Sequence, residues 1–119
     1  YVTHVAPTPE EAIIQINQAG GVAIIAHPFA SRRGEIISAE SFTSLIAAGL
    51  HGIEVDHRDQ TLVERRQLAE IADELGLVKT GASDYHGTGK LNELGENLTH
   101  PDQWERLESL ASARRVIRK

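Results

Sequence analysis

The chain has 119 residues, of which 40% are hydrophobic and 24% are charged, and this composition is typical of a folded domain rather than a disordered tail. Its formal net charge of −5 argues against long duplex nucleic acid as a partner, and its longest apolar run, residues 22–26, is too short to span a membrane. Cysteine is absent, which excludes disulfides and thiolate metal sites, and the cytoplasm is the default expectation for location.

The first half of the chain predicts two helices and two strands. Thr8 and Glu11 form a capping box, so a helix is expected over about 9–19. The apolar run 22–26, rich in β-branched residues, is typical of a strand buried on both faces. A polar loop, a helix over about 39–48 and a short strand over 52–56 follow.

The second half repeats this alternation. Thr61 and Glu64 form another capping box, and apolar residues at helical spacing predict a helix over 61–75. A strand over 77–82 and a glycine-rich polar loop over 83–97 follow. The last helix is expected to begin near Pro101 and to face inward with Trp104, Leu107 and Leu110 or Ala111. Helices between consecutive strands indicate three parallel strands with right-handed crossovers.

Three parallel strands make an incomplete sheet on their own, because parallel sheets need both faces covered and their edge strands invite further pairing. The chain also contains no methionine and begins at Tyr1, so we expect a processed product or a fragment. These observations predict that residues 1–119 are the carboxyl-terminal portion of one larger α/β barrel or sheet. The missing amino-terminal portion would supply the other strands.

Histidines and carboxylates follow each predicted strand, at the edge where ligands bind in parallel α/β folds. His27 and Pro28 follow the first strand, His57 follows the second, and Asp84 and His86 follow the third. A carboxylate with imidazoles suits Zn²⁺, Mn²⁺ or Fe²⁺. We expect Pro28 to hold His27 in an extended conformation, and an extended 84–86 segment to point both of its side chains the same way. The structural alternatives are a rim histidine bonded to loop backbone and a turn capped by Asp84.

Other polar residues carry two interpretations each. Arg58 could hold a phosphate through its forked donors or lie at the surface before the Thr61 cap. Arg32 and Arg33 form a loop pair for which solvation is the simpler interpretation. Glu54, inside a strand, should be paired or bound, and Lys90 is a candidate anion contact. The remaining histidines and the basic end are interpreted as structural or solvated: His4, His51, His100 and residues 114–119.

Three motifs, in this order, resemble the PHP (polymerase and histidinol phosphatase) superfamily, and most closely its stand-alone bacterial phosphoesterases. They are GGVAIIAHP at 20–28, GIEV at 52–55 and GLVKTGASDYHG at 76–87, and LGEN at 94–97 is similar to the stretch that follows the last motif. The resemblance spans roughly residues 9–97. It implies the carboxyl-terminal portion of a distorted (β/α)₇ barrel.

The same resemblance implies a hydrolase that acts on phosphate esters through up to three divalent ions, Mn²⁺, Zn²⁺ or Fe²⁺. His27, Asp84 and His86 match its metal ligands, whereas the other ligands, which include a His-x-His segment, are not in this chain. A metal-bound water would attack phosphorus. Arg32 and Arg58 are candidate substrate contacts, and His57 is a candidate catalytic residue that contacts phosphate or carries a proton.

The favoured substrates are nucleoside 3′,5′-bisphosphates or short oligonucleotides attacked from the 5′ end. The alternatives are a small-molecule phosphatase of the histidinol-phosphate type and a PHP-like scaffold without activity. A response-regulator-like or Rossmann-like sheet would need an acidic phosphoacceptor cluster or a Gly-x-Gly-x-x-Gly turn, and neither motif is present. With three ligands, the 119-residue chain by itself is expected to hold one ion weakly and to show little activity.

Overall fold

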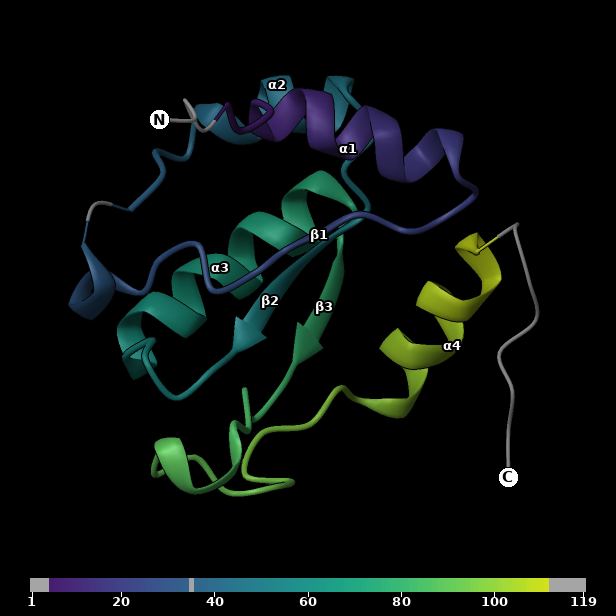
Figure 1. Ribbon diagram of the computed structural model, residues 1–119. Coiled ribbons are helices and arrows are strands. Elements are labelled where there is room, and N and C mark those ends of the chain that lie inside the picture. Colours follow the sequence, from purple (N-terminus) through teal and green to yellow (C-terminus); the bar gives the residue numbers. More distant parts are fainter. Residues whose placement is uncertain (1–4, 35, 112–119) are drawn as a thin grey trace.

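The computed structural model describes residues 5–34 and 36–111 (Figure 1). Within these ranges, three strands alternate with four α-helices, which confirms the predicted α/β fold class. The elements are α1 (Pro9–Gln18), β1 (Ile24–Ile25), α2 (Ser41–Ala47), β2 (Gly52–Asp56), α3 (Leu62–Leu75), β3 (Val78–Gly81) and α4 (Pro101–Leu110). Two short 3₁₀ helices, η1 (Ser31–Arg33) and η2 (Gly87–Gly89), lie in the loops after β1 and β3.

The strands form one parallel sheet in the order β1-β2-β3. Ile24 lies opposite Gly52 at the start of β2. The register between β2 and β3 shifts between Glu54 and Asp56, so that Asp56 lies opposite Gly81. An irregularity of this kind bends a strand and re-aims its side chains, and it often lies near a functional site. Because all pairs are parallel, the carboxyl ends of the three strands meet at one edge.

A buried apolar cluster joins α1, α2 and α3 to the sheet. Phe42 on α2, Ile53 on β2, and Leu68 and Ala72 on α3 are all 0% exposed. Figure 1 shows α3 running along the sheet, with α1 and α2 side by side beyond it. Both predicted capping boxes are present, at Thr8 and Thr61, so local sequence signals determine where α1 and α3 begin.

β2 has the predicted bounds, whereas β1 and β3 are shorter than predicted and α4 packs differently from the prediction. β1 covers two residues rather than 22–26, and β3 covers 78–81 rather than 77–82. Trp104 and Leu110, expected to face inward, are 41% and 42% exposed. Polar contacts hold α4 against β3 instead, since Gln103 Oε1 accepts a hydrogen bond from Lys79 N at 2.9 Å. The side chain of Gln103 therefore satisfies a backbone donor of the β3 strand.

Some predictions fall outside the residues described here. His4 and the basic end, residues 114–119, lie outside them, and the assignment of 1–119 to the carboxyl-terminal portion of one domain stays a prediction. Of the helices in the described ranges, none combines the length and the apolar character that a bilayer crossing requires.

Candidate metal centre

The carboxyl ends of the three strands bring together two imidazoles and a carboxylate. His27, His57 and Asp84 each offer one donor atom within 4.8 Å of the other two. The rings of His27 and His57 are 4.6 Å apart between centroids, at an interplanar angle of 54°. His57 is fully buried, whereas His27 and Asp84 are half-buried. The strand-end prediction therefore holds for the position of these residues.

His27 adopts a left-handed backbone conformation, with φ of +30°. The expectation that Pro28 would keep it extended is wrong. In this left-handed conformation, His27 N donates a hydrogen bond at 2.8 Å to Oε2 of Glu54, a residue of β2. Glu54 therefore bonds to backbone rather than to a cationic side chain. A strained residue held in this way is common at functional sites.

Gln60 fastens the loop after β1 to β2. Its side chain is buried, its Oε1 accepts a hydrogen bond from Phe29 N at 3.0 Å, and its Nε2 donates to Val55 O at 2.6 Å and to Glu54 O at 3.2 Å. Sequence reasoning missed Gln60, because a glutamine between Asp59 and a helix cap carries no signal of burial.

Asp84 also has a left-handed backbone, with φ of +52°, so the 84–86 segment is not extended as predicted. Its Oδ2 accepts from Arg33 at 2.9 Å, from Lys90 Nζ at 3.1 Å and lies 3.3 Å from His57 Nε2. The hydrogen bond from Lys90, followed by those from Arg33 and His57, holds the pKa of the Asp84 carboxyl well below its usual range, against the opposing effect of burial. Asp84 is therefore a carboxylate at any ordinary pH.

Arg33, rather than the predicted Arg32, reaches the cluster. Besides its contact with Asp84, its NH1 lies 3.3 Å from His27 Nε2 and its Nε donates to Asp59 Oδ2 at 2.5 Å. Arg32 is exposed on η1. Asp59 carries no motif, and only the fold brings it to the guanidinium of Arg33, which lowers the pKa of the Asp59 carboxyl.

Hydrogen-bond partners assign the ring tautomer of His57. The backbone N–H of Asp59 donates to His57 Nδ1 at 3.0 Å, so this nitrogen carries the lone pair. The ring hydrogen is then on Nε2, which faces the carboxylate of Asp84. With this tautomer, His57 donates to Asp84 and has no free lone pair for a metal.

The other two histidines have the opposite arrangement. Arginine is only a donor, so the His27 Nε2 that faces Arg33 carries a lone pair. The carbonyl oxygen of Asp84 is only an acceptor, so His86 Nδ1, at 2.6 Å, donates to it and leaves the lone pair on Nε2. A ring N–H bonded to a backbone carbonyl is typical of metal-ligating histidines. Distance to His27 and Asp84 therefore favours His57 as the third metal ligand, whereas the position of the ring lone pair favours His86.

The donor set of the cluster fits a transition metal. Two imidazoles and a carboxylate suit Zn²⁺, Mn²⁺ or Fe²⁺. Ligand atoms around a tetrahedral ion with 2.1 Å bonds lie about 3.4 Å apart. His57 Nε2 and Asp84 Oδ2 are separated by such a distance, but the side chain of His86, 53% exposed, lies outside the compact triplet of described residues.

Arg58, the other predicted substrate contact, is engaged elsewhere. Its NH2 and Nε groups each lie 3.0 Å from an oxygen of Glu96, in the loop after β3. His51 and His100, interpreted as structural, both accept from backbone: His51 Nδ1 from Ala23 N at 3.2 Å, and His100 Nδ1 from Asp102 N at 3.4 Å at the start of α4.

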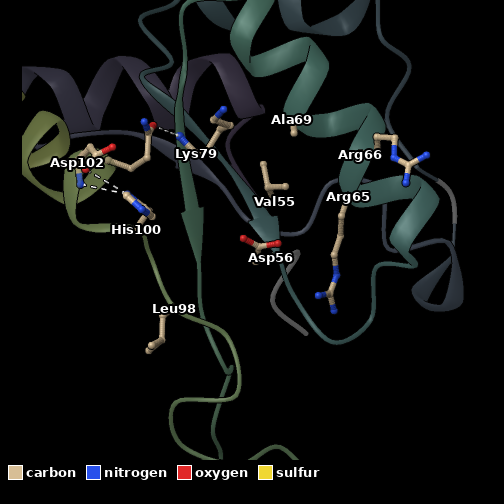
Figure 2. A pocket seen from close by; sticks show the side chains of 10 residues that line it. Val55, Asp56, Arg65, Arg66, Ala69, Lys79, Leu98, His100 and Asp102 are labelled. Atoms are coloured by element: carbon tan, nitrogen blue, oxygen red, sulfur yellow. Dashed lines mark hydrogen bonds and ion pairs between the residues drawn. The ribbon is translucent and has the colours of Figure 1, made fainter.

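A groove of about 520 Å³ lies between α3 and α4, on a different part of the surface. Figure 2 shows the Asp56 carboxylate at the end of β2 and Arg65 reaching down from α3. Arg65 is occupied in holding the β2–α3 loop, since its guanidinium donates to His57 O at 2.7 Å and to Gln60 O at 3.0 Å. None of the three clustered donors lines this groove.

No family model matches the chain. The chain is similar to three curated proteins, and it spans only 31–40% of their length. A phosphoribosyl 1,2-cyclic phosphate 1,2-diphosphodiesterase of Eggerthella lenta is 38% identical over 71% of the chain and 31% of its own length. A 3′,5′-nucleoside bisphosphate phosphatase of Chromobacterium violaceum is 32% identical over 92% of the chain and 40% of its own length. A 5′-3′ exoribonuclease of Haemophilus influenzae is 35% identical over 80% of the chain and 36% of its own length.

Two solved structures share the fold. One, from Bifidobacterium adolescentis, carries the provisional name metal-dependent phosphoesterase; it matches with a TM-score of 0.86 and 38% identity, over 94% of this chain and 40% of that one. The other is an amidohydrolase of Chromobacterium violaceum with bound sulfate and no metal. It matches with a TM-score of 0.71 and 30% identity, over 92% of this chain and 39% of that one. Sequence and fold together place the chain in the PHP-type phosphoesterase family, as the three strand-end motifs predicted.

Proposed function

We propose that the chain carries part of the active site of a metal-dependent phosphoesterase, with His27, Asp84 and His86 as metal ligands. The observation that carries the proposal is the convergence of three strand ends, which brings donor atoms of His27, His57 and Asp84 within 4.8 Å of one another. The hydrogen bond from His86 Nδ1 to the Asp84 carbonyl supports His86 as the third ligand, because it leaves Nε2 free.

The cofactor is a divalent ion, Mn²⁺, Zn²⁺ or Fe²⁺, and the resemblance implies up to three ions in a complete domain. When bound, such an ion lowers the pKa of a water and neutralises phosphate oxygens. In this chain, Asp84 supplies a carboxylate that is ionised at ordinary pH, and His27 supplies a ring nitrogen with its lone pair toward the cluster.

His57 is better suited to positioning than to the catalytic role that the sequence suggested. It is fully buried, its Nδ1 is engaged by Asp59 N, and its Nε2 lies 3.3 Å from Asp84 Oδ2. It therefore orients the carboxylate of Asp84. Arg32 and Arg58 stay candidate contacts for a substrate that extends along the rim, such as an oligonucleotide.

The proposed substrates are nucleoside 3′,5′-bisphosphates or short oligonucleotides attacked from the 5′ end. Support comes from two relatives, which are named as a 3′,5′-nucleoside bisphosphate phosphatase and a 5′-3′ exoribonuclease. Both names describe phosphate esters of nucleotides rather than of an amino alcohol such as histidinol. The expected location remains the cytoplasm.

The test is calorimetric titration of the chain with Mn²⁺, together with release of phosphate from adenosine 3′,5′-bisphosphate and from histidinol phosphate. The Asp84→Asn and His86→Ala variants should each bind Mn²⁺ at least about tenfold more weakly. Asp73→Asn, a matched change at an exposed position on α3, should not alter binding. Phosphate release should be slow, dependent on Mn²⁺ and faster from the bisphosphate.

Three results would count against the proposal. Unchanged Mn²⁺ affinity in Asp84→Asn would remove this carboxylate from the site. Unchanged affinity in His86→Ala, combined with a loss in His57→Gln, would make the compact triplet the ligand set. Metal binding without any metal-dependent phosphate release, in a protein that also contains the predicted amino-terminal portion, would favour the scaffold alternative.

A further inference from the structure

We infer that Arg33, assisted by Lys90, couples metal binding to phosphate binding at the cluster. A cation that binds Asp84 releases the guanidinium of Arg33, and the released guanidinium binds a phosphate oxygen. This inference rests on the proposed function, because it takes His27 and Asp84 as metal ligands.

The guanidinium of Arg33 bridges two of the proposed ligand atoms. Its NH2 donates to Asp84 Oδ2 at 2.9 Å, and its NH1 lies 3.3 Å from His27 Nε2. A divalent ion held by His27 Nε2 and by Asp84 Oδ2, the carboxylate oxygen that faces His57, would use these same two atoms. Arg33 and a metal ion therefore compete for the same two atoms.

The carboxylate oxygen itself has no capacity left. Asp84 Oδ2 receives N–H groups from Arg33, Lys90 and His57, at 2.9, 3.1 and 3.3 Å. An oxygen of this kind has two lone pairs, so a cation bound there must replace at least one donor. His57 is fixed through its other ring nitrogen by the hydrogen bond from Asp59 N, whereas the Arg33 and Lys90 side chains are 37% and 36% exposed, so their terminal groups can be displaced more easily.

A second carboxylate keeps Arg33 at the site after it leaves Asp84. Its Nε donates to Asp59 Oδ2 at 2.5 Å, through an atom that takes no part in the Asp84 contact. The planar guanidinium can therefore pivot about this bond while the side chain stays beside the cluster. Its two terminal NH2 groups keep four N–H donors that match phosphate oxygens, and Lys90 adds a second positive charge.

Charge then links the two binding events. A divalent ion and a guanidinium a few ångströms apart repel each other, and a phosphate dianion between them removes that repulsion. Phosphate should therefore raise the affinity for Mn²⁺, and Mn²⁺ should raise the affinity for phosphate by the same factor. Arg66, an exposed arginine on α3 that is not part of the cluster, should contribute nothing to this coupling.

The experiment titrates Mn²⁺ into the 119-residue chain by calorimetry, with and without inorganic phosphate, for the wild-type chain and for Arg33→Gln, Lys90→Gln and Arg66→Gln. In the wild-type chain, phosphate should raise the Mn²⁺ affinity about fivefold or more. Arg33→Gln should bind Mn²⁺ more tightly without phosphate, by a few-fold, and should lose most of the phosphate effect. Lys90→Gln should lose part of it, and Arg66→Gln should match the wild-type chain.

The outcomes separate this inference from the proposed function. Mn²⁺ binding with a phosphate effect that is equal in Arg33→Gln and in the wild-type chain would overturn the coupling alone. Weaker Mn²⁺ binding in Arg33→Gln without phosphate would also overturn it, since Arg33 would then support the site rather than compete for it. No Mn²⁺ binding to either the wild-type chain or Arg66→Gln would overturn the ligand set, and the coupling with it. Circular-dichroism melting confirms that each variant is folded.

Discussion

The unit formed by β2 and α3 and the two loops that carry the cluster are held by different forces. In the unit, Ile53, Leu68 and Ala72 pack an apolar interface with 0% exposure, between elements that are neighbours in the chain. In the loops after β1 and β3, two ligand candidates have positive φ, and side chains up to 51 residues apart hold them. The unit is a packed scaffold, and the loops are a hydrogen-bonded network built on it.

This contrast teaches where stability and function are separated in the chain. Apolar burial scales with area and does not depend on direction, so the scaffold should tolerate loss of a site residue. The network depends on individual donors and acceptors, so removing one member should change ligand binding more than it changes folding. The substitutions below test that division in order of expected effect.

Leu68→Ala should cause the largest loss of stability. Its side chain is fully buried on α3, and truncation leaves a cavity, so the free energy of unfolding should fall by about 3 kcal/mol. Urea denaturation followed by circular dichroism measures the change. Leu75→Ala, on the same helix with 43% exposure, is the matched control and should lose much less. Equal losses would mean that α3 does not bury the face described here.

The features that could be predicted from the sequence belong mostly to the packed scaffold, and those that could not belong mostly to the loops. The α3 bounds were predictable from Thr61, Glu64 and the apolar spacing, because capping and periodicity are local signals. The strand-end positions of His27, His57 and Asp84 were also predictable, because parallel strands share one ligand edge. The conformations of His27 and Asp84 were not, since they accompany contacts with Glu54, Arg33 and Lys90 across the fold. Which arginine of the 32–33 pair faces the cluster likewise depends on the turn of η1.

Gln60→Ala should give the next largest effect and should act on both regions. The change removes the hydrogen bond that Gln60 accepts from Phe29 N and the two that it donates to Val55 O and Glu54 O. Because Phe29 N and Val55 O then lose a buried partner, the free energy of unfolding should fall by about 2 kcal/mol. Because Gln60 fastens the loop that carries His27 and Arg33, the affinity for Mn²⁺ should also fall. Gln67→Ala, at an exposed position on α3, is the matched control. A stable Gln60→Ala chain with wild-type metal affinity would separate the loop from the scaffold.

Thr61→Ala should reduce stability by about 1 kcal/mol and leave metal binding unchanged. The Thr61 hydroxyl accepts a hydrogen bond from Glu64 N at 3.2 Å, so the change leaves one N–H at the start of α3 without its cap. Thermal melting and the Mn²⁺ titration are the two measurements. Loss of metal affinity in Thr61→Ala would show that the start of α3 belongs to the site network rather than to the scaffold.

Glu64→Gln should have the smallest effect, and that effect should depend on pH, because Glu64 joins the two regions. Its carboxylate accepts from the Ser31 hydroxyl of η1 and from Thr61 N at 2.6 Å, and these contacts lower the pKa of the Glu64 carboxyl, the Ser31 bond most. A lowered folded-state pKa contributes stability above the unfolded value of 4.5, and this contribution is lost as pH falls through the folded value. Glu64→Gln should therefore lower the melting temperature by about 2 °C at pH 7, and the difference should shrink toward pH 3. Glu70→Gln, at an exposed position on the same helix, controls for the general effect of removing a charge. A difference between Glu64→Gln and the wild-type chain that does not change from pH 7 to pH 3 would mean that the charge of Glu64 does not contribute to the link between η1 and α3.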